Sequence, residues 1–405
     1  MANILYLVHR LPYPPNKGDK VRSYHLLRHL AARHRVYLGT FVDDEDDWQH
    51  VAHLQTLCAE VHALNLHPMW ARIFSLRGLL GGEALSLPYY RSRAMQSWVC
   101  GLSRRVPLDA SVVFSSTMAQ YAMALDPVPM LVDFVDVDSA KWADYAEAHA
   151  WPMSWLYRRE GRELLAFEQS VARHARSSFF VTENELALFR RLSPALEASV
   201  EALCNGVDAD FFAPDPARVS PFAPGQIPLV FTGAMDYWPN VDAVTWFAAE
   251  VLPRLRDEFP QLHFHIVGRA PTQAVQRLAG KGVSVTGTVP DVRPYLQHAA
   301  AVVAPLRLAR GIQNKVLEAM AMARPVVAAR TCAEVIEARD GVELMAAETV
   351  PEYVKHLGDL LRDPQSCERM GAAGRDCVLA RYSWDAHLSA VDRYFSPLPT
   401  GGVGA

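Results

Sequence analysis

The chain has 405 residues, 50% hydrophobic and 21% charged, with a formal net charge of −4. This length predicts two domains, the composition is that of a globular protein, and the charge gives no electrostatic case for binding nucleic acid. The cysteines are scattered without close pairs, which favours reduced thiols and a cytoplasmic protein with no metal site. The first apolar run, Ile4–Val8, is too short for a signal peptide, and no window resembles a membrane span.

The first part of the chain alternates strand-like and helix-like segments. Apolar runs at 3–9, 35–42 and 61–66 surround an amphipathic helix at 21–34 and a helix that opens with acidic residues 43–47. This alternation predicts a parallel sheet with helices on both faces, which binds ligands at the carboxyl ends of its strands. Gly18 and Arg22 follow the first strand and are therefore candidates for ligand binding. The alternative is a generic proline-rich loop.

Residues 70–98 interrupt the alternation with a mixture of aromatic and basic side chains, among them Trp70, Phe74, Arg72 and Arg77. Such a mixture suits a surface that touches anionic lipid. The alternative is a helical excursion that packs its aromatic side chains inward, which the break at Gly81–Gly82 favours.

Strands are predicted at 111–116 and 130–136. The second leaves Asp133, Asp136 and Asp138 near its carboxyl end. Asp136 is a candidate catalytic residue, and the alternative for all three is helix capping or turn formation. A long helix at 151–176, a strand at 177–182 and a helix at 183–192 follow. A strand then enters Asn205–Gly206, and the proline-rich stretch to about Pro228 predicts a linker between domains.

From Ile227 the alternation restarts, with strands predicted at 227–233, 263–268, 283–289, 301–306 and 325–329. Gly233 and Gly268 each close a strand, where a ligand could approach the backbone. The tail from Pro351 is predicted to be helical, and residues 398–405 to be disordered.

The segment at 304–328 predicts a strand end, a loop, a helix that begins near Gly311, and a new strand after Pro325. The helix start and Lys315 together suit a diphosphate, while the Glu318 carboxylate can accept the protons of ribose hydroxyls. This combination suits a sugar nucleotide. The alternative is a solvated Lys–Glu pair on an ordinary surface helix.

The segments CNGVDADFF, FTGAMDYWPNVDA, HIVGRAP, VTGTVPDVRPYL and APLRLARGIQNKVLEAMAMARPVV, in this order, resemble retaining glycosyltransferases of the GT-B type, family 4. The likeness is greatest to the sugar transferases of PEP-CTERM/exosortase exopolysaccharide clusters. It implies two Rossmann-like doubly wound domains that face a cleft: an acceptor domain at 1–205 and a donor domain at 206–382. Helix 383–397 would cross back onto the first domain.

The resemblance implies transfer of a sugar from a UDP- or GDP-linked donor to a glycan or polyprenyl-linked acceptor. It would use no further cofactor, at the inner face of the cytoplasmic membrane. Lys315 and Asp136 are the candidate catalytic residues. The candidate donor-binding residues are Gly18, Arg22, Gly233, Gly268, Arg269, Arg310, Gly311, Ile312, Lys315 and Glu318.

The sequence departs from the family pattern at two places. Arg310 replaces the first of two glutamates, and GAMDYWPN replaces a common Arg and Lys, so Lys315 is expected to take over diphosphate binding. A sugar-nucleotide epimerase of the same fold and a non-catalytic scaffold beside a membrane are the alternatives. A dehydrogenase is disfavoured because the loop after the first strand lacks G-x-G-x-x-G.

Overall fold

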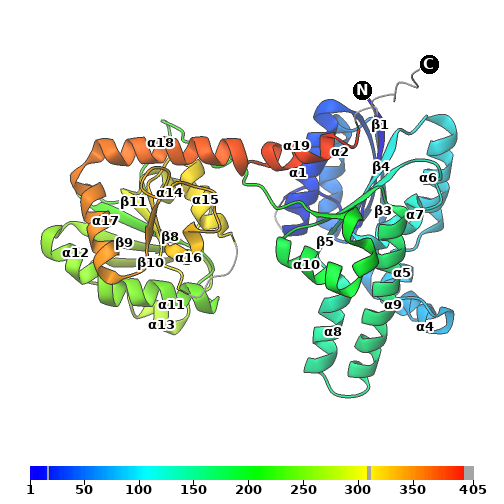
Figure 1. Cartoon of the computed structure of the whole chain (residues 1–405), viewed down its shortest axis with the longest axis horizontal. Coiled ribbons are helices and arrows are strands. Elements are labelled where there is room, and N and C mark those ends of the chain that lie inside the picture. Colours follow the sequence, from blue (N-terminus) through cyan, green and yellow to red (C-terminus); the bar gives the residue numbers. More distant parts are fainter. Residues whose placement is uncertain (16–17, 308–311, 396–405) are drawn as a thin grey trace. The chain divides into compact units, whose positions relative to one another are not determined.

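The computed structural model describes residues 1–15, 18–307 and 312–395. Its contacts divide the chain into two units, each built around its own parallel sheet (Figure 1). The first unit comprises residues 1–205 together with the segment that begins at Leu388, and the second comprises Gly206–His387.

The first unit contains a seven-stranded sheet in the order β3-β2-β1-β4-β5-β6-β7. All neighbouring strands are parallel, and the central β1 pairs with β2 on one side and β4 on the other. The chain therefore builds outward from β1 in both directions, and the carboxyl ends of β1 and β4 form the topological switch point. The strands are β1 Asn3–Val8, β2 Arg35–Val42, β3 Glu60–Asn65, β4 Ala110–Phe114, β5 Met130–Val135, β6 Ser177–Phe180 and β7 Val200–Ala202.

Central strands of this sheet are buried on both faces, which is why they appear in the sequence as continuous apolar runs. Helices α8 and α9 lie side by side as an antiparallel pair (Figure 1). The helices of the unit are α1 Gly18–Arg33, α2 Val51–Leu57, α3 Pro68–Ser75, α4 Arg77–Gly81, α5 Ser86–Tyr89, α6 Arg93–Arg105, α7 Ala119–Ala122, α8 Asp138–Ala148, α9 Met153–His174 and α10 Glu183–Leu192. The acidic segment at 43–47 leads into a 3₁₀ helix at Glu45–His50.

Helix α1 buries a polar face. The Arg22 guanidinium donates to both carboxylate oxygens of Asp133 on β5, at 2.7 and 3.1 Å, and to Oδ1 of Asn205 at 2.9 Å. Lys20 contacts Asp47 at 2.5 Å. Since a buried charge is costly unless it is paired, these contacts hold α1 in one position against the sheet.

The second unit contains a six-stranded parallel sheet in the order β10-β9-β8-β11-β12-β13. Its strands are β8 Ile227–Thr232, β9 Leu262–Val267, β10 Val283–Gly287, β11 Ala301–Ala304, β12 Val326–Ala329 and β13 Met345–Ala347. Its helices are α11 Trp238–Trp246, α12 Leu252–Glu258, α13 Gln273–Gln276, α14 Arg293–Gln297, α15 Asn314–Ala321, α16 Arg330–Ala333, α17 Val350–Arg362 and α18 Pro364–Arg381. Helix α19, Trp384–Asp392, begins in this unit and belongs to the first unit from Leu388 onward. The predicted pair of doubly wound parallel sheets is thereby confirmed.

The aromatic residues at 70–98 divide between surface and core. Trp70 and Phe74 on α3 are 59% and 47% exposed. Tyr89, Tyr90 and Trp98 instead pack against the core of the first unit. The inward-packing alternative therefore holds for these three side chains, and contact of the exposed side chains with lipid stays a prediction. Across the described parts of the chain, we find no helix with the length and apolar character needed to cross a bilayer.

Candidate functional site

The loops after β8 and β9 meet at the carboxyl edge of the second sheet. A Cβ at Gly268 would lie 1.7 Å from the carbonyl oxygen of Gly233, so only glycine fits there. The Gly233 amide donates to the carbonyl of Val267 at 3.0 Å, and the Met235 amide donates to that of Arg269 at 2.8 Å. These contacts join the two loops, and the half-buried Gly233 and Gly268 lie at the edge where parallel sheets bind ligands.

Lys315 lies directly against this pair of loops. Its ammonium group donates to Oδ1 of Asn240 at 2.6 Å and lies 4.2 Å from the centroid of the Phe231 ring. A Cβ at Gly233 would be 3.0 Å from the same Nζ atom. Asn240 in turn donates to the carbonyl of Ala234 at 2.8 Å. The cation is thus fixed by a neutral amide and an aromatic face at the strand's end.

Burial shifts the protonation of both candidate side chains on α15. It lowers the pKa of Lys315 to about 8, against the opposing effect of Glu318. It raises the pKa of Glu318 to about 7, and Lys315 opposes that shift. Among the described residues no ion pair joins the two, so the alternative of a solvated Lys–Glu pair is not what the structure contains. A partner of suitable charge would therefore stabilise the charged form of each group.

The predicted helix start near Gly311 is wrong. Helix α15 begins at Asn314, because Gln313 has an extended backbone with φ −98° and ψ 107°. Lys315 is therefore in the first turn, where free N–H groups and the helix dipole favour an anion. Ile312 lies two residues before the helix and is 37% exposed. Arg310 and Gly311 lie outside the described residues.

The remaining predicted site residues lie in several places. Arg269 is exposed and directly follows Gly268. Gly18 and Arg22 belong to α1 of the first unit, where Asp133 and Asn205 engage the Arg22 guanidinium. Asp136 follows β5 in that unit and pairs with Lys141 at 2.7 Å. The second unit therefore brings together Gly233, Gly268, Arg269, Lys315 and Glu318. Their roles stay predictions.

Two features of this edge were not predicted from the sequence. One is Asn240, which is 5% exposed and connects Lys315 to the loop after β8. The other is Arg307 after β11, which pairs with Asp242 of α11 at 2.6 Å. The available signal was the polar Asn240 within the otherwise apolar start of α11, because a buried amide needs partners.

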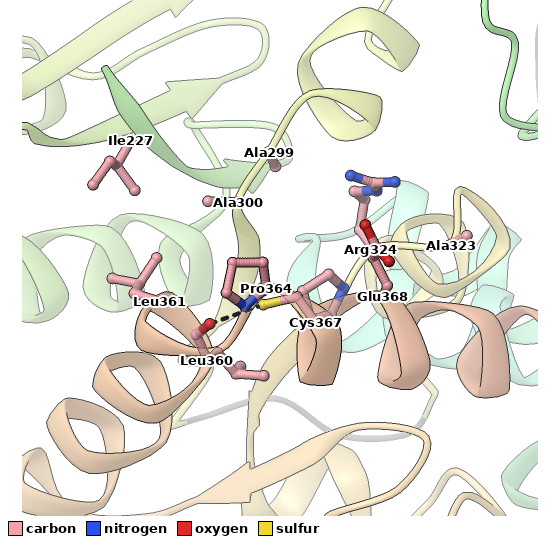
Figure 2. Close-up of a pocket in the computed structure, with 11 residues that line it drawn as sticks. Ile227, Ala299, Ala300, Ala323, Arg324, Leu360, Leu361, Pro364, Cys367 and Glu368 are labelled. Carbon is pink, nitrogen blue, oxygen red and sulfur yellow. Dashed lines mark hydrogen bonds between the residues drawn. The ribbon is translucent and has the colours of Figure 1, made fainter. Parts of the chain in front are cut away.

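A pocket of about 310 Å³ lies at the opposite edge of the same sheet, lined by residues that precede β11 and β12 (Figure 2). Burial lowers the pKa of Arg324 there, and Glu368 lies on the same wall. Residues that precede parallel strands lie at the amino ends of those strands, so this pocket is separate from the Lys315 site. The Lys315 site lies at the carboxyl ends, where doubly wound folds bind their ligands. Among the described residues, no group of three or more His, Cys, Asp or Glu side chains is arranged to hold a metal ion.

Two curated mycobacterial proteins are similar to this chain. One is the GDP-mannose-dependent alpha-(1-6)-phosphatidylinositol monomannoside mannosyltransferase of Mycolicibacterium smegmatis, 32% identical over 208 residues, which are 46% of this chain and 53% of the relative. The other is the D-inositol 3-phosphate glycosyltransferase of Mycolicibacterium paratuberculosis, 30% identical over 245 residues, which are 55% of this chain and 53% of the relative. The chain spans about half the length of these relatives, at 53% of each.

The whole fold is similar to a solved structure, that of Anabaena HepE in complex with UDP. The TM-score is 0.62 at 14% sequence identity, covering 98% of this chain and 100% of the other. This likeness concerns the fold alone, which is GT-B. Residues 226–363, which hold the Lys315 site, match the model of the family "Glycosyl transferases group 1". Residues 226–363 of the second unit are therefore similar to the glycosyl transferases group 1 family.

Proposed function

We propose that the protein is a glycosyltransferase that moves a sugar from a nucleotide-sugar donor to a hydroxyl group of an acceptor. One observation carries this proposal: Lys315, in the first turn of α15, lies against the backbone of the Gly233–Gly268 loops. A cation and a helix start beside half-buried glycine backbone at one strand end are groups that suit a diphosphate. The family match covers the same residues.

In the proposed reaction, the bond between the anomeric carbon and the diphosphate oxygen breaks, and a bond to the acceptor oxygen forms. The acceptor hydroxyl loses its proton, and the nucleoside diphosphate leaves with the electron pair of the broken bond. Lys315 would stabilise that growing negative charge, so it acts most strongly in the transition state. Glu318 would bind the ribose hydroxyls, whose charge does not change.

We further propose that the donor carries UDP or GDP, that transfer retains the anomeric configuration, and that the product belongs to an exopolysaccharide. The choice of nucleotides is supported by two similar proteins: one is a GDP-mannose-dependent mannosyltransferase, and the structure of the other contains UDP. Asp136, Gly18 and Arg22 remain proposed contributions of the first unit. We expect transfer without a metal. Loss of activity in EDTA, restored by magnesium or manganese, contradicts this expectation.

The test is steady-state kinetics of Lys315→Ala and Glu318→Gln beside the parent, with donor hydrolysis measured in the absence of acceptor. A charged hydrogen bond contributes roughly 1.5–3 kcal/mol, so we expect effects of about ten- to a hundredfold. Lys315→Ala should mainly lower kcat, and Glu318→Gln should mainly raise KM. Release of free nucleoside diphosphate with an epimerised sugar, and no transfer to any acceptor, indicates an epimerase instead.

We also propose that α3 and α4 touch the anionic inner face of the cytoplasmic membrane. Six apolar side chains between residues 69 and 79 are exposed: Met69, Trp70, Ile73, Phe74, Leu76 and Leu79. Arg77 lies 5.0 Å from the centroid of the Phe74 ring, which places a cation within this surface. Exposed apolar groups with interleaved arginines favour binding to anionic lipid.

A further inference from the structure

The first unit has a pocket of about 280 Å³ at its topological switch point. His9 follows β1 and Ser115 follows β4, and both line this pocket, which we call the inner pocket. Thr117, Asp138 and Lys141 are also in its lining. The inner pocket therefore offers hydroxyl, imidazole, carboxylate and ammonium groups at the place where doubly wound folds bind small polar ligands.

The backbone at this edge is strained. Ser115 has φ +74°, and the β-branched Val135 at the end of β5 has φ +70°. Residues other than glycine avoid this region, and when they occupy it the strain often belongs to a functional site. Nδ1 of His9 is buried and has no hydrogen-bond partner among the described residues. The inner pocket thus combines strained backbone with a polar atom that lacks a protein partner.

A second pocket of about 360 Å³, the outer pocket, adjoins the inner pocket. The two share Ser86, Tyr90 and Trp142. The outer pocket is lined mainly by aromatic and aliphatic side chains, including Tyr89, Leu156 and Tyr157. A polar pocket that continues into an apolar one suits a ligand with a polar head and an apolar chain.

Buried Glu160 in the outer pocket is not a free charge. Its carboxylate accepts hydrogen bonds from the amides of Leu85 and Ser86, at 2.6 and 2.9 Å, and from the Ser86 hydroxyl at 2.6 Å. These bonds hold α5 against α9, so the carboxylate fixes the wall between the two pockets. It does not compete for a ligand, and the pocket keeps its apolar character.

Helix α3 connects the outer pocket to the protein surface. Its inward side contributes Ser75 to the pocket, while Ile73 and Phe74 are exposed. Arg72, also on α3, lines the pocket and is itself exposed. A chain that leaves the outer pocket past α3 therefore meets a cation and then an apolar surface.

We infer that the two pockets of the first unit bind an amphiphilic acceptor, with its sugar head in the inner pocket and the start of its apolar chain in the outer pocket. This inference rests on the proposed function and names the acceptor class, a sugar carried on a lipid. Sugar hydroxyls match the polar groups around His9 and Asp138. The apolar chain matches the aromatic walls and the exposed side of α3.

The experiment titrates the full chain with methyl, hexyl, heptyl and octyl β-D-glucosides, each below its micelle concentration, and follows tryptophan fluorescence. Burial of one methylene corresponds to about a fourfold change in affinity. We expect affinity to rise about fourfold per added methylene from hexyl to octyl. Equal affinities across the series overturn the inference. Free glucose oligomers are titrated in the same way, and an affinity that rises with their length, and not with the length of the alkyl chain, also overturns it.

Two variants fill the outer pocket from different helices: Leu156→Trp on α9 and Ser75→Leu on α3. Both should abolish the dependence on chain length and keep the weak binding of methyl glucoside. Leu192→Ser, on α10 and 39% exposed but outside both pockets, is the control and should behave like the parent. A dependence that persists in both filled variants places the chain elsewhere and contradicts the inference.

UDP binding, measured in parallel, separates this inference from the proposed function. Glucoside binding without nucleotide binding refutes the transferase and leaves the amphiphile site intact. Nucleotide binding and transfer without any dependence on chain length refute the amphiphile site alone.

Discussion

Lys315 keeps its charge in an unfavourable setting. Its hydrogen-bond partner is the neutral amide of Asn240, and burial lowers its pKa to about 8. A neutral amide satisfies one of the three ammonium donors but does not neutralise the charge. The site is therefore incomplete in electrostatic terms, and an anion such as a diphosphate would complete it.

Glu318 should make the stability of the protein depend on pH. Its pKa is raised from 4.5 to about 7, so the folded state binds more protons than the unfolded state between these values. The unfolding free energy of the parent should therefore fall as pH rises through this window. Glu318→Gln removes the titrating group, so the variant should gain stability relative to the parent, by up to about 3 kcal/mol at the upper end.

Urea denaturation of the parent and Glu318→Gln at several pH values across this window measures the difference. Below the lower end of this window, where Glu318 is protonated in both states, the two proteins should be similarly stable. A constant difference across the whole window would show that Glu318 is not desolvated in the folded state.

At the scale of elements, the turn at Gly206 is a point of close packing. A Cβ at this position would lie 2.5 Å from both Cα and N of Trp384, at the start of α19. Gly206→Ala should therefore force a backbone shift and lower the unfolding free energy by about 1–3 kcal/mol. Gly101→Ala on α6 is the matched control, because no atom lies within 4 Å of its added Cβ.

Thermal and urea unfolding of both variants measures this effect. The control should equal or exceed the parent in stability, since alanine favours a helix over glycine. Equal stability of Gly206→Ala and the parent would mean that α19 can move away from the turn without cost.

Most strands could be predicted because buried parallel strands are continuous β-branched and aromatic runs, as in Asn3–Val8 and Arg35–Val42. The start of α15 was predicted three residues early, because the extended backbone of Gln313 has no local sequence signal. Asn240 was missed because its partner Lys315 is 75 residues away in the chain. The two pockets of the first unit escaped prediction for the same reason, since α3, α5 and α9 meet only in the folded chain.

At the scale of the whole molecule, the exposed apolar side chains of α3 and α4 predict binding to anionic membranes. Vesicles that contain phosphatidylserine should sediment the protein, and added salt should release it. Trp70→Ser combined with Phe74→Ser removes two exposed aromatic groups and should weaken binding at least about tenfold. Equal sedimentation with neutral and anionic vesicles, or none with either, contradicts a membrane role for this surface.

The central claim is that the second unit binds a nucleoside diphosphate through Lys315. Calorimetric titration of UDP and GDP into the parent and Lys315→Met tests it directly, at about pH 9 in two buffers of different ionisation enthalpy. Free Lys315 is then largely neutral, since its pKa is about 8, and a bound diphosphate favours its charged form. We predict tight binding of one nucleotide to the parent with uptake of more than about half a proton. Lys315→Met should bind at least about tenfold more weakly, with no uptake. Equal affinity of the two proteins, or no proton uptake by the parent, would contradict the assignment.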